Sequence, residues 1–200
     1  ELLSVSLYAL IAYHNKSLLP MEAASKYLVL SGAATATLLF GFALLYAASG
    51  TLEFAAMGAA LGSSEMGGTL IMVGEGMIFV GLGFKLSVVP FHLWTPDVYD
   101  GAPAPISGYL ASVGKAAVFV ALLRFFLEAD LFRYQRLVEL IGLMAILSMI
   151  AGNLLALLQT NIKRMLAYSS IAHIGYLLIV LMVVLKAQSQ ALAHEAAIFY

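Results

Sequence analysis

The sequence predicts an all-α fold in which several helices cross a lipid bilayer as a polytopic bundle. Of the 200 residues, 62% are hydrophobic and 10% are charged, and the mean hydropathy is +0.97, far above that of soluble domains. The apolar residues gather in runs of about 20, the length that crosses a hydrocarbon core about 30 Å thick as a helix. Cysteine is absent, which excludes a disulfide framework, a cysteine-ligated metal and thiol catalysis.

Each expected element is defined by an apolar run and the residues that end it. A partial span over 1–13 ends at "HNKSLLP", and the span over about 20–48 opens on Pro20, a residue that the first turn of a helix accepts. Residues 49–68 are rich in Gly and Ser and are predicted to form a loop. The remaining runs predict spans over 69–97 (broken), 106–127, 137–158, 165–185 and 190–200 (partial). We expect one membrane domain that is a fragment of a longer subunit.

The charged residues exclude a nucleic-acid partner, because the formal net charge is −1 and no run of Lys and Arg is long. The count of basic residues barely distinguishes the two sides of the membrane. We call "inner" the side that carries Lys16, Lys26, Lys163 and Arg164.

The depth of each ionisable residue decides which of them needs an explanation, because a charge at the bilayer centre costs about 3 kcal/mol or more. At a rise of about 1.5 Å per residue, Glu1, Lys85 and Lys115 all come out near the midplane, on three different spans. His173 lies about 14 Å in by the same count. Each could alone be a structural residue, but three ionisable groups at one depth favour a proton relay.

Glu75 lies ten residues before Lys85, which places it about 15 Å farther out along the same span. We therefore expect it at the outer interface, away from the midplane groups, and dispensable for a relay.

Pro90 predicts a break in the span over 69–97, because proline removes a backbone donor and disfavours helical geometry at Val89 as well. Irregular backbone at membrane depth persists only where it is buried in protein or lines a watery cavity. Lys85 is thus expected beside a helix break, as at the ion sites of transporters. The residues that follow predict a rigid re-entry at the interface: Phe91, His92, Trp94, Pro96, Tyr99, Pro103 and Pro105.

Signatures of soluble enzymes are missing from the chain. It has no phosphate-binding loop motif and no paired histidines at metal-ligand spacing, and its four histidines lie on separate segments. No residue pattern indicates a quinone site, and none excludes one.

Two long motifs resemble the antiporter-like membrane subunits of respiratory complex I, the proton-pumping NADH:quinone oxidoreductase. They are "FKLSVVPFHLWTPDVYDGAPAPISGYLASVGKAA" and "GNLLALLQTNIKRMLAYSSIAHIGYLL". The resemblance is to the bacterial chain N type, covers nearly the whole chain, and implies the fifth to eleventh helices of a longer subunit.

The resemblance implies a set of relay residues. Members of the family pair a helix-five glutamate with a helix-seven lysine beside a helix break, and a helix-eight lysine or histidine leads on to an ionisable residue of helix twelve. Glu1, Lys85 and Lys115 match the first three positions, and the fourth lies beyond residue 200. His173, in "SSIAHIGY", is a candidate relay residue with a less defined role.

The resemblance also implies the partners and the location. NADH, FMN, the Fe–S clusters and quinone belong to partner subunits, and no cofactor is expected in this chain. Its partners would be other membrane subunits of complex I, lipid, protons and water, in the bacterial inner membrane. Two alternatives stay open: a Na⁺/H⁺ antiporter subunit of the multisubunit type, and a passive scaffold whose buried charges only fix helix packing.

Overall fold

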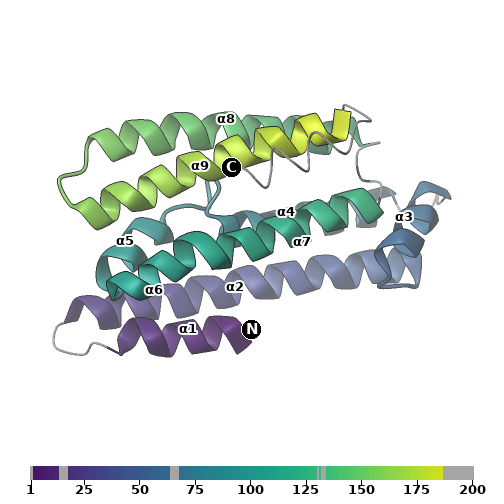
Figure 1. Cartoon of the computed structure of the whole chain (residues 1–200). Helices are drawn as coiled ribbons and strands as arrows, with labels where there is room; N and C mark the ends of the chain where they lie inside the picture. The colour runs from purple at the N-terminus through teal and green to yellow at the C-terminus, as the bar shows by residue number, and fades with distance from the viewer. Residues whose placement is uncertain (1, 14–17, 64–67, 130, 132–133, 187–200) are drawn as a thin grey trace.

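The computed structural model describes residues 2–13, 18–63, 68–129, 131 and 134–186, and helices make up nearly all of this part (Figure 1). The described helices are α1 (Leu2–Ala12), α2 (Leu18–Ser49), α3 (Phe54–Ser63), α4 (Gly68–Leu86), α5 (Trp94–Gly101), α6 (Ala104–Tyr109), the π-helix η1 (Leu110–Gly114), α7 (Lys115–Glu128), α8 (Gln135–Leu157) and α9 (Ile162–Lys186). The predicted all-α fold is confirmed.

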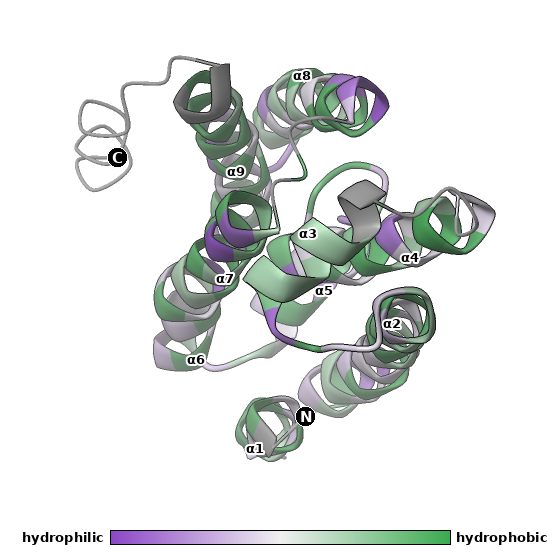
Figure 2. Ribbon diagram, turned by 90° about the vertical axis from the view of Figure 1, so that its right-hand side faces the viewer, coloured by the Kyte–Doolittle hydropathy of each residue, from purple (hydrophilic) through white to green (hydrophobic). Residues whose placement is uncertain are grey.

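Five helical stretches of the described chain are long and apolar enough to cross a membrane: Leu18–Ser49, Gly68–Leu86, Ala104–Glu128, Gln135–Leu157 and Ile162–Val183. The helix α1 is apolar but shorter, and the further span expected over 190–200 lies outside the described residues. Viewed along the helix axes, hydrophobic residues cover the outer as well as the inner faces of the bundle (Figure 2). The chain is therefore a multi-pass membrane protein.

Small residues allow the helices to pack closely. A Cβ atom built on Gly81 of α4 would lie 2.6 Å from Leu38 Cβ and 2.9 Å from the Ala34 carbonyl oxygen of α2. The pair α8 and α9 shows the same feature, since a Cβ on Gly175 would lie 2.8 Å from the Ala145 carbonyl oxygen. Without a hydrophobic force between helices in lipid, such close backbone approach supplies the van der Waals contact that holds them together.

The loop predicted over 49–68 is wrong, because its middle forms the helix α3. The sequence "FAAMGAALGS" is rich in alanine, a strong helix former, which outweighs its glycines and serine. Phe54 packs edge-on against Phe125 of α7 with 5.1 Å between ring centroids, and Met57 is fully buried. Tertiary packing at this end of the bundle therefore decides the conformation.

The predicted break in the span over 69–97 is confirmed, and it begins earlier than Pro90. The helix α4 ends at Leu86, and α5 starts at Trp94. Ser87 adopts a left-handed backbone conformation with φ of 63°, and the Val89–Pro90 peptide bond is cis. The proline thus marks the break, while the helix itself stops one turn before it.

Side chains form hydrogen bonds with backbone groups within and next to the break. The indole Nε1 of Trp94 donates to the carbonyl oxygen of Phe84 at 3.1 Å, so the start of α5 is bonded back to the end of α4. The amide of Val89 donates to Ser148 Oγ of α8 at 3.0 Å. The break is therefore held by specific hydrogen bonds within protein.

Of the residues in the predicted re-entry, Trp94 and Tyr99 are 5% and 2% exposed and are buried inside the bundle. The Trp94 ring lies between Phe84 and Tyr27, with centroid separations of 5.2 and 5.5 Å. The break turns the chain back into the bundle, and aromatic rings fill the space that the missing helical turn leaves.

The Gly81→Ala substitution is expected to destabilise the fold by about 1 to 3 kcal/mol, because the added methyl would push α2 and α4 apart. On the same helix, a Cβ at Gly76 would meet nothing within 4 Å. Gly76→Ala should therefore be neutral, or stabilising by up to about 1 kcal/mol. Thermal unfolding of the purified variants measures both effects, and equal stability would show that α2 and α4 do not need this close approach.

Candidate functional site

Lys85 lies in the last turn of α4, directly before the break. Its side chain borders a cavity of about 50 Å³ that Ser4 of α1, Ser31 of α2 and Gly114 of η1 also line. Among the described residues Lys85 has no hydrogen bond or ion pair, and Glu1, its predicted partner, lies outside them. The structure thus places a half-buried lysine in a small space with hydroxyl groups, between the break and the first turns of α1.

Lys115 is the first residue of α7 and follows the π-helix η1, a feature that the sequence did not indicate. It is 4% exposed, and its ammonium donates a hydrogen bond to Ser170 Oγ of α9. Its Nζ lies 5.8 Å from the centroid of the Tyr99 ring. A π-helical turn within a helix commonly marks a functional position.

The two lysines face opposite sides of one helix. Leu110 and Gly114 line the cavity of Lys85, whereas Lys115 borders a cavity of about 420 Å³ between α7 and α9. Gly114, which lines the Lys85 cavity, has no side chain and directly precedes Lys115. Residues of this one helix therefore line both cavities, and Gly114 contributes no side chain between them.

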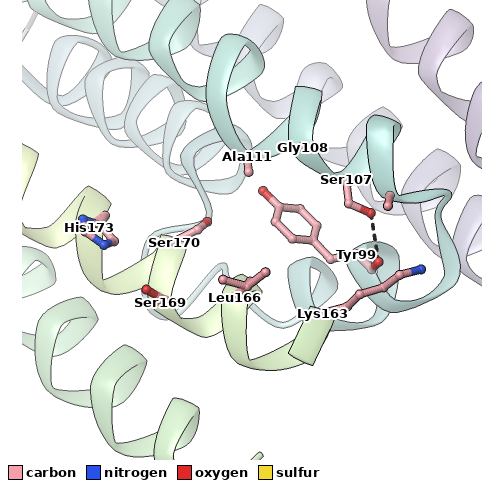
Figure 3. A pocket seen from close by; sticks show the side chains of 10 residues that line it. Tyr99, Ser107, Gly108, Ala111, Lys163, Leu166, Ser169, Ser170 and His173 are labelled. Carbon is pink, nitrogen blue, oxygen red and sulfur yellow. Dashed lines mark hydrogen bonds between the residues drawn. The ribbon is translucent and has the colours of Figure 1, made fainter. Parts of the chain in front are cut away.

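A third cavity, of about 380 Å³, lies between α5, α6 and α9 (Figure 3). Ser170 and His173 line both this cavity and the cavity of Lys115. His173 is exposed to them, with its ring edge-on to Tyr176 at 6.2 Å. The candidate residue His173 is therefore close to the hydrogen-bond partner of Lys115. Ser170 was missed from the sequence, because a single serine in a span carries no sign of which way it faces.

Tyr99 lines the third cavity from α5. Ser107 Oγ donates to its backbone carbonyl oxygen at 2.9 Å, which fixes α5 to α6 (Figure 3). Burial raises the pKa of the Tyr99 hydroxyl, and the neighbouring Ser170 lowers it only in part. The phenol is thus neutral at physiological pH.

The helix α5 is anchored at its inner end by ion pairs. Asp97 accepts hydrogen bonds from Lys26 Nζ of α2 at 2.8 Å and from Arg164 Nη1 of α9 at 2.7 Å. Nearby, Lys163 Nζ donates to the carbonyl oxygens of Asp100 and Ala102. Burial alone would raise the pKa of Asp97, but the hydrogen bonds from Lys26 and Arg164 outweigh it, and the pKa lies below its usual value.

Glu75, which the sequence predicts at the outer interface, faces the interior of the bundle. It is the eighth residue of α4, about 10 Å from the helix start, and is only 6% exposed. Its Oε1 has no hydrogen-bond partner within the described chain. Counting residues gives depth along a helix but not which side the residue faces. Glu75 lines neither of the cavities that border Lys85 and Lys115.

The described part of the chain has no group of three or more His, Asp or Glu side chains that could together hold a metal ion. The chemistry that the site offers is therefore that of amines, hydroxyls and one imidazole at membrane depth.

The Asp97→Asn substitution is expected to lower stability by about 1 kcal/mol or more at neutral pH, because it removes the charge that two cations share. The pKa of Asp97 is lowered in the folded state, so this stabilisation is present above its ordinary value of about 4 and is lost as the pH falls through the lowered pKa. The difference in thermal stability between variant and wild type should then vanish in acid. The control is Glu128→Gln, which breaks an exposed pair with Arg124 and should cost about 0.5 kcal/mol at most. Equal effects of the two substitutions would show that Asp97 does not anchor α5.

Comparison with known proteins places this arrangement in a family. The family model described as "NADH:quinone oxidoreductase/Mrp antiporter, TM" matches residues 1–200. A chain of respiratory complex I from Thermus thermophilus is 41% identical with a TM-score of 0.74, over 93% of this chain and 39% of its own length. A chain of the membrane-bound sulfane sulfur reductase, an archaeal respiratory membrane complex, is 35% identical with a TM-score of 0.77, over 90% of this chain and 36% of that one.

The Mrp complex from Dietzia sp. DQ12-45-1b contains a chain with the same fold, at 22% identity and a TM-score of 0.77, over 88% of this chain and 33% of that one. The sequence thus spans well under half the length of each of these three chains. The family model and the 41% identical chain agree with the family resemblance of the sequence. The chain belongs to the family of antiporter-like membrane subunits of NADH:quinone oxidoreductases and Mrp antiporters.

Proposed function

We propose that this chain moves protons across the membrane as a non-redox subunit of NADH:quinone oxidoreductase, through a relay that includes Lys85 and Lys115. Support comes from the family and from the 41% identity to a chain of Thermus complex I. The bacterial inner membrane is the proposed location. NADH, FMN, Fe–S clusters and quinone would be held by partner subunits, so this chain contributes translocation and not electron transfer.

The observation that carries the proposal is that Lys85 and Lys115 border two cavities that share one helix in their linings, with Gly114 in the first and Lys115 in the second. Each lysine borders its own cavity, and each cavity has hydroxyl groups in its lining. An intramembrane amine that faces such a space can exchange its proton with water, whereas one packed in hydrocarbon cannot. A proton that leaves Lys85 needs to pass only the Gly114 turn to reach Lys115.

Glu1 is proposed to set the charge of Lys85. Ser4, three residues along the sequence from Glu1, lines the Lys85 cavity. A carboxylate within about 6 Å stabilises a charged lysine, and its withdrawal, or the arrival of another cation, favours release of the proton. Electron transfer in partner subunits would drive this change through conformation and charge.

Lys115 is proposed to receive the proton and to pass it on. Ser170 accepts a hydrogen bond from its ammonium, which stabilises the charged form in a buried site. The next acceptor would lie in the part of the subunit beyond residue 200. His173, which lines both cavities beside Ser170, is the candidate for a step in between.

One alternative is a subunit of a multisubunit Na⁺/H⁺ antiporter, since the family model includes Mrp antiporters and the Dietzia Mrp chain has the same fold. Purification of the native complex distinguishes the two, because an oxidoreductase brings NADH-oxidising partner subunits with it. The other alternative, a passive scaffold, predicts that loss of either lysine harms assembly as much as pumping.

Lys85→Ala and Lys115→Ala are expected to leave the complex assembled but to reduce the number of protons pumped per electron. Quinone reduction and proton uptake are measured together in vesicles, with the amount of assembled complex determined for each variant. Normal pumping in both assembled variants would contradict the relay and leave the scaffold alternative standing.

Glu75→Gln is the matched comparison, since it neutralises a buried carboxyl that borders neither lysine cavity, and pumping should stay near normal. A loss as large as that of Lys85→Ala would mean that the path runs outward along α4.

Glu1→Ala combined with Lys85→Ala should reduce pumping no more than either substitution alone, because both act on one proton transfer. Additive losses would argue that Glu1 and Lys85 act separately.

A further inference from the structure

Tyr99 is buried next to Lys115. It belongs to α5, the second half of the broken helix whose first half, α4, carries Lys85. It is 2% exposed, and Ser107 binds its backbone carbonyl group from α6. Figure 3 shows its hydroxyl directed away from Lys163 and toward the side of the cavity where Ala111 lies. The ring therefore has little freedom to move independently of α5.

The ammonium of Lys115 has few stabilising partners for a buried charge. It is 4% exposed, and the hydrogen bond to Ser170 is the one polar contact that the described residues show for it. No described carboxylate forms an ion pair with it. The two acids of α5, the carboxylates nearest along the chain to Tyr99, are bonded elsewhere: Asp97 to Lys26 and Arg164, and Asp100 to Asn161.

The face of the Tyr99 ring offers the second stabilising contact. Lys115 Nζ lies 5.8 Å from the ring centroid, within the range at which the negative face of an aromatic ring attracts a cation. This attraction is stronger when both groups are removed from water, as they are here. The Tyr99 hydroxyl lies near Ser170 but makes no hydrogen bond of good geometry with a described residue. The contact with Lys115 is therefore made by the ring.

We propose that Tyr99 is a positioning residue for proton transfer: its ring holds the Lys115 ammonium beside Ser170 and couples Lys115 to the helix break next to Lys85. A displacement of α5 would move the ring and weaken its hold on the charged lysine. Loss of this contact favours proton release from Lys115, and the proton then passes to the next acceptor. This inference rests on the proposed relay and names the residue through which the break acts on it.

The test varies the electron density on the face of the ring at nearly constant shape. In the assembled complex, Tyr99 is replaced by Phe, by phenylalanines that carry increasing numbers of ring fluorines, and by Leu. Fluorine withdraws electron density from the ring face and weakens its attraction for a cation with little change in size. Protons pumped per electron are measured in vesicles, and Tyr109, 38% exposed on α6, receives the same substitutions as a control.

We expect Tyr99→Phe to pump nearly as wild type, because the ring remains. The fluorinated series should show a graded loss that follows the number of fluorines, and Tyr99→Leu should lose as much as Lys115→Ala. The same series at Tyr109 should have no effect. If Tyr99→Leu fails to assemble, the fluorinated variants, which are nearly isosteric with Phe, still decide the question.

Two results would overturn the inference. A flat fluorinated series would mean that the ring only fills space, and a loss in Tyr99→Phe equal to that in Tyr99→Leu would assign the role to the hydroxyl. Either result, obtained while Lys115→Ala still reduces pumping, removes the role of the ring and leaves the relay intact. Normal pumping in Lys115→Ala would instead remove the relay itself.

Discussion

The arrangement of the site depends on how the chain satisfies the backbone groups that are freed between α4 and α5. A broken helix within a membrane leaves amides and carbonyls without partners, and each costs several kcal/mol if it meets only hydrocarbon. Here the Phe84 carbonyl oxygen accepts a bond from the Trp94 indole, and the Val89 amide donates to Ser148 of α8. These bonds make the break a fixed part of the fold, so that Lys85 is held at the end of a helix and beside a cavity.

The same break sets the position of Lys115, although that lysine lies on another helix. The helix α5 is tied to α2 and α9 through Asp97, and to α6 through the bond from Ser107 to Tyr99. Tyr99 then presents its ring to Lys115. Three helices thus meet the second half of the broken helix, and the Tyr99 ring connects it to Lys115. Such a path of rigid contacts is a physical route by which two ionisable groups can influence each other.

The sequence predicts much of this fold because its strongest signals give the position of each residue along a helix. The apolar runs give the spans, Pro90 gives the break, and counting residues places Lys85 and Lys115 at similar depth. The direction in which a side chain faces is not given by these signals, because it depends on packing against distant segments of the chain. For this reason Glu75 was expected at the outer interface, although the structure buries it on a face of α4 that packs within the bundle. Tyr99 and Ser170 became candidates only when α5, α7 and α9 were seen together.

In the proposed function, Lys85 and Lys115 form one proton path that passes the helical turn at Gly114. The most direct measurement is a structure of the intact complex at a resolution that reveals ordered water. We predict waters that run from Lys85 past Gly114 to Lys115, interrupted only by side chains that can exchange protons. Tight apolar packing between the two ammonium groups, with no room for water in any state of the complex, would contradict the account.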